Sequence, residues 1–231
     1  MNSPQPIAAT IAGEDVRLLP QRALYWPAKK LLVIADIHFG KAATFRALGV
    51  PVPAGTTTQN LAALDTLLAL HAVQQILFLG DFLHAKAAHA RATLAAIRAW
   101  RTRHQGLYLT LVRGNHDDRA GDPPPDLDIM VVDEPHVIGP FVFCHHPQES
   151  VHGHVLAGHV HPVHRLASGA DALRLPCFVI GAQRSILPSF GAFTGGHAVT
   201  ASAKEQLFVV ADDRVFAIPA TPPGGRRMRW R

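Results

Sequence analysis

The feature that most constrains this sequence is an apolar segment that ends on two metal-ligating side chains. Residues 31–35 form an uninterrupted apolar run, and Asp36 and His38 follow it with one residue between them. A short apolar run bounded by polar residues is typical of a strand that is buried on both faces of a parallel sheet. The carboxyl ends of such strands meet at one crevice, which is where ligands bind in open α/β sheets. We therefore expect Asp36 and His38 to lie at a functional site.

Four later apolar runs also end on residues that bind metals. In chain order these residues are Asp81 after the run 76–79, Asn115 and His116 after 107–112, His145 after 137–144, and His159 and His161 after 155–157. Alone, several of these endings read as ordinary turns, because Gly, Asn and Asp are common turn residues. Residues two apart on an extended segment point the same way, so His159 and His161 can enter one cleft. Five runs with the same kind of ending make chance an implausible explanation.

The side chains in this set are oxygen and nitrogen donors. Carboxylate, imidazole and amide ligands suit manganese, iron or zinc, and they argue against an iron–sulfur cluster or copper. Seven or eight such groups are too many for one ion. They fit two ions that share a bridging carboxylate.

The order of the predicted elements changes in the middle of the chain. The first half reads strand, helix, strand, helix, strand, with helices over residues 56–71 and 88–103. After the Pro-rich segment 121–125, short predicted strands follow one another with little helix between them. This order favours a four-layer or sandwich-like α/β domain over two separate domains. We expect a single domain over residues 1–220 and a basic, flexible tail over residues 221–231.

Composition is that of a globular protein. Hydrophobic residues make up 48% and charged residues 17%, and no apolar run approaches the roughly 18 residues of a membrane span. The first residues lack the basic and apolar regions of a signal peptide. Two cysteines, Cys144 and Cys177, are too few for a disulfide framework, and each lies in an apolar run. We expect two buried thiols and a cytoplasmic protein with no membrane partner.

The positive charge is concentrated in the tail. The formal net charge is +5, and the arginines at positions 226, 227, 229 and 231 supply four units, so 5 minus 4 leaves +1 for the body. One interpretation is a solvated chain end. The other is an arm that contacts phosphate groups, with Trp230 available to stack on a base.

Taken in order, the motifs resemble those of one enzyme family. The order Asp-x-His, Gly-Asp, Gly-Asn-His-Asp, His and Gly-His-x-His, which covers residues 36–161, resembles that of the calcineurin-like metallophosphoesterases. The resemblance implies an α/β fold, a four-layer sandwich of two mixed β-sheets flanked by helices, with a binuclear metal site. It implies that one ion binds Asp36, His38 and His161 and that the other binds Asn115, His145 and His159. Asp81 would bridge the two ions. It also implies that His116 is a catalytic residue that binds no metal and lies beside the scissile phosphate.

Two assignments stay open. The family usually has His-Gly at the fourth motif, where this chain has His145-His146-Pro147, and the end of the apolar run favours His145 over His146 as the ligand. His84 lies three residues after Asp81 and resembles a histidine that assists catalysis in DNA-repair nucleases of the superfamily. Alternatively, His84 caps the helix that follows it.

A further resemblance narrows the substrate. Residues 36–41 and 187–196, together with a β-hairpin expected over residues 7–19 and the short length, are similar to the bacterial DNA-ligase-associated metallophosphoesterases. That group implies a phosphodiesterase or endonuclease of DNA repair, linked to an ATP-dependent DNA ligase and a helicase. Lys41 and Arg184 are candidate substrate contacts, although an exposed Lys or Arg is more often only solvated.

The leading expectation is therefore a phosphodiesterase with two divalent ions, manganese first and iron or zinc as alternatives, that acts on nucleic acid, DNA above all. A second hypothesis keeps the same metal site but takes a small nucleotide, a pyrophosphate or a phosphomonoester as the substrate. The nearly neutral net charge of the chain without its tail favours this hypothesis. A third is a non-catalytic scaffold for repair proteins. The sequence leaves the oligomeric state, monomer or homodimer, open.

Overall fold

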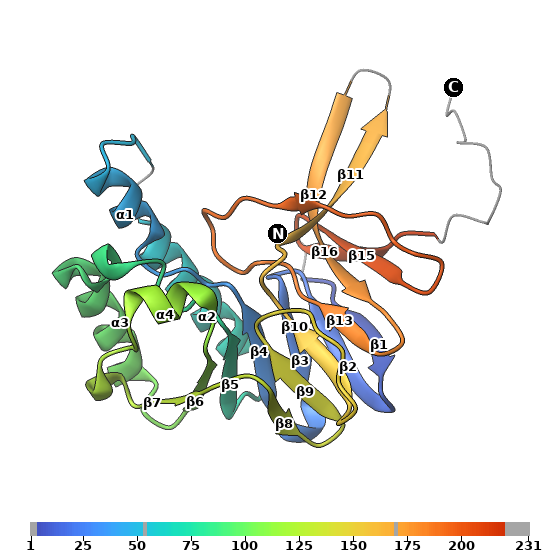
Figure 1. Ribbon diagram of the computed structural model, residues 1–231, viewed down its shortest axis with the longest axis horizontal. Helices are drawn as coiled ribbons and strands as arrows, with labels where there is room; N and C mark the ends of the chain where they lie inside the picture. Colours follow the sequence, from blue (N-terminus) through green and yellow to red (C-terminus); the bar gives the residue numbers. More distant parts are fainter. Residues whose placement is uncertain (1–3, 53–54, 169–170, 220–231) are drawn as a thin grey trace.

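Two β-sheets packed face to face, with helices on one side, form the frame of the molecule. The computed structural model describes residues 4–52, 55–168 and 171–219. In Figure 1 the helices cover one face of the first sheet, and the second sheet packs against its other face. The arginine-rich tail, for which we considered two interpretations, lies outside the described residues.

The first sheet contains the strands of the first half of the chain, in the order β1-β2-β3-β4-β5-β6-β7. Strands β1 to β4 pair antiparallel, and β4 to β7 pair parallel. The bounds are Ile7–Ile11, Glu14–Leu19, Ala23–Trp26, Leu31–Ala35, Gln75–Leu79, Tyr108–Val112 and Ile129–Val132. Every residue of β4 is buried, which confirms the strand expected from the apolar run 31–35.

The helices of the described chain all precede β7. They are α1 (Lys41–Ala47), α2 (Thr56–Leu70), α3 (Arg91–Arg103) and α4 (Asn115–Ala120), with 3-10 turns at Pro27–Lys29, Lys86–His89 and Pro125–Leu127. The helix expected to begin at Ala88 begins at Arg91, because the preceding residues form a separate 3-10 turn. Among the described residues, no helix combines the length and the apolar character that crossing a bilayer requires.

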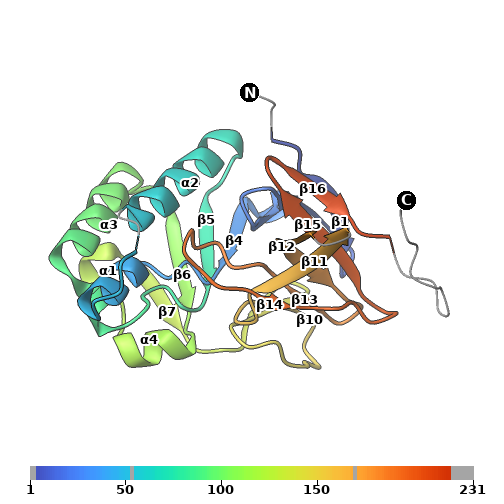
Figure 2. The same cartoon turned by 90° about the horizontal axis from the view of Figure 1, so that it is seen from above.

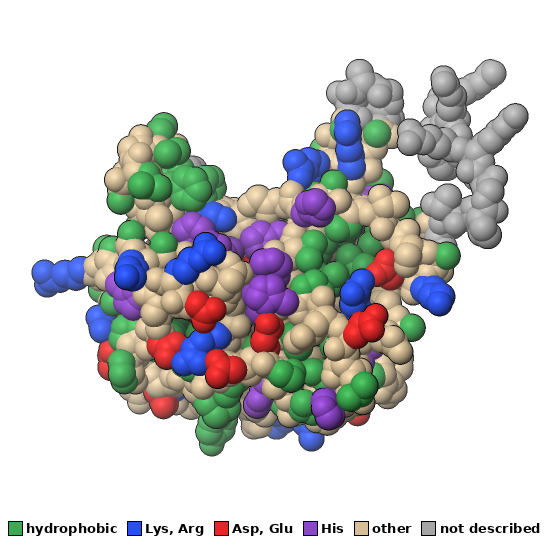
Figure 3. Space-filling view, viewed as in Figure 1, with side chains coloured by type: hydrophobic (Ala, Val, Ile, Leu, Met, Phe, Trp, Pro, Cys, Tyr) green, Lys and Arg blue, Asp and Glu red, His purple; other side chains and the backbone are tan. Residues whose placement is uncertain are grey.

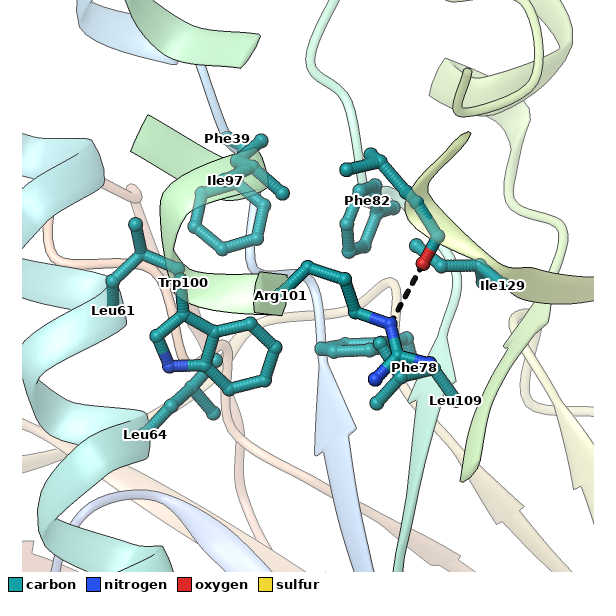
Figure 4. Close-up of a pocket in the computed structure, with 11 residues that line it drawn as sticks. Phe39, Leu61, Leu64, Phe78, Phe82, Ile97, Trp100, Arg101, Leu109 and Ile129 are labelled. Atoms are coloured by element: carbon teal, nitrogen blue, oxygen red, sulfur yellow. Dashed lines mark hydrogen bonds between the residues drawn. The ribbon is translucent and has the colours of Figure 1, made fainter. Parts of the chain in front are cut away.

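Aromatic and aliphatic side chains fill the space between α2, α3 and the first sheet (Figure 4). The cavity left among them has a volume of about 10 Å³, barely enough for one water molecule. Arg101 enters this core with its charge satisfied: Nε donates to the Leu127 carbonyl at 2.9 Å, and Nη2 donates to Asp128 Oδ2 at 2.8 Å. This region is therefore packed core and not a ligand site.

The second sheet contains the strands of the second half. Its order is β14-β11-β12-β13-β10-β9-β8, with β15 paired to β12 and β16 paired to β15. The bounds of β8 to β16 are His136–Ile138, Phe141–Cys144, His154–Ala157, Pro162–Ser168, Asp171–Ile180, Arg184–Ile186, His197–Ala198, Gln206–Ala211 and Arg214–Ala217. The single strand expected over 137–144 is instead the antiparallel pair β8 and β9, because Gly139, at φ 58°, and Pro140 turn the chain.

Large aromatic side chains fill the interface between the two sheets. Trp26 from β3 packs edge-on against Phe141 from β9, and Phe143 and Phe178 belong to the same buried cluster. The expected sandwich of two mixed sheets with flanking helices is confirmed. Within the described residues the helices flank the first sheet only, and strands and loops cover the outer face of the second (Figure 2). Both cysteines are buried and free, as expected.

Substitution in the interface between the sheets should cost most of the stability. Phe143→Ala removes a side chain that is 0% exposed, and we expect it to lower the free energy of unfolding by about 3–5 kcal/mol. Phe216→Ala is the matched control, since Phe216 is 44% exposed and should change stability by no more than about 0.5 kcal/mol. Urea denaturation measures both, and equal losses would contradict this account of the core.

Candidate metal centre

The ends of five strands meet where the two sheets approach each other. Strands β4, β5 and β6 are parallel neighbours in the first sheet, and β9 and β10 are parallel neighbours in the second. The motif residues follow these ends directly: Asp36 and His38 after β4, Asp81 after β5, Asn115 and His116 after β6, His145 after β9, and His159 and His161 after β10. A band of histidine side chains crosses the middle of this face (Figure 3).

Four residues form a first cluster: Asp36, His38, Asp81 and His161. Each offers one ligand atom, and these atoms all lie within 4.8 Å of one another. Asp36 Oδ1 lies 3.5 Å from His161 Nε2, and His38 Nε2 lies 3.7 Å from Asp81 Oδ2. The structure thus brings together the four residues that the family resemblance assigns to one ion.

A second cluster forms around the Nε2 atom of His145. Asn115 Oδ1 and His159 Nδ1 each lie 3.0 Å from this atom, and Asp81 Oδ1 lies 3.5 Å from it. Asp81 therefore belongs to both clusters. Its Oδ1 atom faces the second cluster and its Oδ2 atom faces His38 of the first, which is the placement that a bridging carboxylate needs.

Backbone carbonyl groups fix which nitrogen of several rings faces the clusters. His145 Nδ1 lies 3.2 Å from the Leu79 carbonyl oxygen, and His161 Nδ1 lies 3.3 Å from that of Gly195. Because a carbonyl oxygen only accepts, each Nδ1 carries the hydrogen and each Nε2 keeps its lone pair for the cluster. Such outer hydrogen bonds orient the histidine ligands of metal sites.

Most of the cluster residues have a left-handed backbone. Asp36, His38, Asp81, His159 and His161 have φ values between 49° and 66°. This conformation is uncommon for residues other than glycine, and it concentrates at functional sites because the surrounding structure must enforce it. These left-handed residues lie just after the ends of β4, β5 and β10, where the side chains form the two clusters.

The motif glycines leave room for these side chains. A Cβ atom at Gly158 would lie 2.7 Å from Asp36 Oδ2, and one at Gly80 would overlap the imidazole of His145. Only glycine allows the backbone to approach the ligands so closely. The glycines of the Gly-Asp and Gly-His-x-His motifs are therefore part of the site, although they offer no ligand atom.

The sequence matches a protein family that is described as Calcineurin-like phosphoesterase. The match covers residues 29–166, which is more than half of the chain. The chain belongs to the calcineurin-like phosphoesterase family. Among solved structures it is similar to the crystal structure of Pseudomonas putida nuclease MPE, with 48% sequence identity and a TM-score of 0.83. That similarity covers 93% of this chain and 100% of the nuclease chain. The comparison with curated proteins gave no match.

Calcineurin-like phosphoesterases bind two divalent metal ions, and the side chains present here fit such a pair. The donors are carboxylate oxygens, an amide oxygen and imidazole nitrogens, with Asp36 and Asp81 almost fully buried. Burial, and then the neighbouring charge of Lys41, lowers the pKa of His38, and burial also lowers the pKa of His159. These rings are neutral at pH 7, which is the form that binds a metal.

The structure separates the two histidines at the fourth motif. His145 is 0% exposed and points into the second cluster. The side chain of His146 is 45% exposed, and its Nδ1 lies 2.8 Å from Glu134 Oε1. Its ring also lies close enough to His145 and His159 for the three histidines to bind one metal ion together. The geometry favours His145 as the ligand and gives His146 a contact with Glu134.

His84 lies beside the clusters. Its ring stacks on that of His116, with centroids 4.7 Å apart, and its Nδ1 lies 3.4 Å from His38 Nδ1. Burial, followed by the charges of Lys41 and His116, lowers the pKa of His84 to about 4. The alternative that His84 caps the next helix is wrong, because the cap positions are Ala85 for the 3-10 turn and Ala90 for α3.

Of the two candidate substrate contacts, only Lys41 lies at the site. Lys41 begins α1, half-buried, where burial lowers its pKa and the charges of Asp81 and Asp36 raise it. Arg184 is exposed at the start of β13, in register with Val155 near the beginning of β10. The structure therefore does not bring Arg184 to the clusters, which lie at the other end of β10.

Sequence reasoning missed two carboxylates that hold the loops in place. Asp117 is buried and accepts hydrogen bonds from the backbone N–H groups of Phe82, Leu83 and Gly114. Glu134 accepts from the backbone N–H of His145 at 2.6 Å. The Gly-Asn-His-Asp motif could have indicated Asp117, whereas Glu134 lies in a turn with no recognisable pattern.

The clearance at Gly158 should be needed for metal binding. Gly158→Ala places a methyl group against the Asp36 carboxylate, so we expect metal affinity to fall by about 10–100-fold, as when partners of metal ligands are removed. Gly106→Ala is the matched control, because a Cβ there would have nothing within 4 Å. Calorimetric titration with manganese, after circular dichroism has shown both variants folded, measures the effect. Unchanged affinity in Gly158→Ala would contradict the clearance argument.

Proposed function

We propose that this protein is a phosphodiesterase that depends on two divalent metal ions and cleaves nucleic acid, with DNA as its substrate. The position of Asp81 carries the proposal. Its two oxygens face two different ligand clusters, at 3.5 Å from His145 Nε2 and 3.7 Å from His38 Nε2. The similarity to a nuclease over 93% of the chain supports the choice of substrate.

In this proposal each ion has its own ligands and the two share one. Asp36, His38 and His161 would hold the first ion, Asn115, His145 and His159 would hold the second, and Asp81 would be shared by both. Two bound divalent ions bind phosphate oxygens and lower the pKa of a water molecule. We propose manganese as the native ion, with iron or zinc as alternatives, because mixed oxygen and nitrogen donors suit all three.

His116 is the residue that we propose to face the leaving group. Its Nδ1 donates to the His84 carbonyl oxygen at 2.7 Å, and its Nε2 lies 4.0 Å from Asp81 Oδ2. Its side chain is 29% exposed, so a substrate can reach it. An imidazole can carry a proton at neutral pH and give it to a departing alkoxide. The stacked ring of His84 supports His116 in this position.

The cationic side chain of Lys41 completes the proposed machinery. It begins the short helix α1 directly after the loop that carries His38, within electrostatic reach of Asp36 and Asp81. A lysine there can bind a non-bridging oxygen of the substrate as a point charge. We also propose a cytoplasmic role in DNA repair beside an ATP-dependent ligase and a helicase, on the resemblance to the DNA-ligase-associated group.

A small nucleotide is the second candidate substrate. The chain carries a net charge of +5, of which the tail supplies four units, whereas a nucleic-acid-binding domain commonly shows a broad basic face. Salt separates the two candidates. Binding to DNA weakens steeply with salt because counterions are released, whereas a small substrate depends on salt only weakly.

The substrate prediction is tested with a panel of single-stranded DNA, duplex DNA, RNA and nucleotides, each with manganese at 50 and 200 mM salt. We expect DNA cleavage, with kcat/KM falling by about tenfold or more between the two salt concentrations as a few phosphate contacts weaken. Bis(p-nitrophenyl) phosphate, a diester with a single phosphate group, is the control and should lose far less. Efficient nucleotide hydrolysis without DNA cleavage would favour the second candidate.

The metal centre is tested by one pair of substitutions. Asp81→Asn should abolish hydrolysis of bis(p-nitrophenyl) phosphate, because the amide cannot bridge two cations, and metal content should fall. His116→Ala should slow hydrolysis by about 10²–10⁴-fold and leave metal content intact. Asp118→Asn, an exposed neighbour on α4, is the matched control. Full activity in Asp81→Asn would refute the site, and metal loss in His116→Ala would make His116 a ligand.

A further inference from the structure

A cavity opens on the His161 side of the metal centre. It lies between the β11–β12 hairpin, the segment Ser189–Gly196 and the turn that joins β2 to β3, and its volume is about 200 Å³. Pockets for drug-sized ligands have volumes of about 300–1,000 Å³, so this cavity suits a smaller group. His161 belongs both to the first cluster and to the cavity wall.

Arg22 brings a guanidinium group to the cavity without a matching carboxylate. It lies in the β2–β3 turn at φ 62°, a conformation that costs free energy in an arginine. Burial lowers its pKa, and no charged partner contributes. In the described part of the chain its one side-chain hydrogen bond is from Nη1 to the Gly191 carbonyl, at 3.4 Å. Arg22 is only partly buried, and most of the five donors of its guanidinium group are free to bind an anion in the cavity.

A second arginine, on the β11–β12 hairpin, lines the other side of the cavity. Arg174 on β12 lines the cavity and donates through Nη2 to the Gly196 carbonyl. The hairpin register places Arg165 of β11 directly opposite Arg174, on the same face. Two like charges in this position repel each other, and an anion beside them removes that cost. Basic side chains, all of them arginine in this segment, are visible on the hairpin above the band of histidines (Figure 3).

We propose that the cavity lined by Arg22 and Arg174 binds a phosphate group of the substrate strand next to the phosphate that is cleaved. This inference rests on the proposed function, since it needs a substrate with more than one phosphate. Among the described residues that line the cavity none is acidic, and arginine presents paired donors that match phosphate oxygens. Because His161 connects cavity and metal centre, a strand bound across both has its neighbouring phosphate at the arginines.

The first measurement compares arginine variants on two substrates. Arg22→Gln should raise KM for a DNA oligonucleotide by about ten- to a hundredfold, the loss expected for a charged hydrogen bond, and Arg174→Gln should act in the same direction. The loss should be confined to DNA, because bis(p-nitrophenyl) phosphate has no neighbouring phosphate. Arg22→Lys should restore part of the affinity. Arg17→Gln, an exposed arginine on β2, is the matched control.

The second measurement locates the phosphate. Oligonucleotides that carry one neutral methylphosphonate linkage, placed in turn at each position around the cleaved bond, are tested with the wild type and with Arg22→Gln. If Arg22 contacts one phosphate, neutralising that phosphate raises KM in the wild type and adds little in Arg22→Gln. A substrate with and without a 5′-terminal phosphate shows whether the group bound is internal or terminal.

The outcomes separate this inference from the proposed function. Coupling between Arg22 and one phosphate supports the inference and identifies that phosphate. Additive effects at every position, or an unchanged KM for DNA in Arg22→Gln, would overturn it while DNA cleavage stands. If the wild type hydrolyses bis(p-nitrophenyl) phosphate but no nucleic acid, the proposed substrate fails, and this inference fails with it.

Discussion

The burial of two carboxylates at the ends of neighbouring parallel strands is the constraint on which the rest of the structure depends. Asp36 and Asp81 are 0% and 2% exposed. A buried carboxylate is stable only when hydrogen bonds or cations compensate for its lost hydration. The backbone N–H of His159 donates to Asp36, and that of His116 donates to Asp81. These bonds come from distant parts of the chain, so the loops must converge before either carboxylate can be buried.

Function follows from how the surroundings divide positive and negative charge. Carboxylates and imidazoles form the two clusters, where the donors fit cations, whereas Lys41 lies near Asp36 and Asp81 and Arg22 lines the cavity beside His161. A phosphodiester strand has the complementary pattern of regularly spaced negative groups. The nearly neutral net charge of the body is therefore compatible with the proposed nucleic-acid substrate, because binding depends on where charges lie rather than on their sum.

The sequence predicted the ligand-bearing strand ends well and their surroundings poorly. Five apolar runs marked where Asp36, Asp81 and His145 would lie, because burial on both faces leaves a pattern that is visible locally. Arg22 gave no such signal, since its importance arises from packing against a segment about 170 residues later in the chain. The same limit explains Arg184: its residue type was right for a phosphate contact, but only the strand register shows that it lies at the wrong end of β10.

The clusters draw their ligands from both sheets, and this has a mechanical consequence. His38 and Asp81 extend from the first sheet, whereas His145 and His159 extend from the second. A cation bound by ligands from both sheets would stabilise the contact between the sheets, because anything that binds only the native structure stabilises it by mass action. Metal binding and the stability of the contact between the two sheets would then be coupled, and chelation of the ions would weaken that contact.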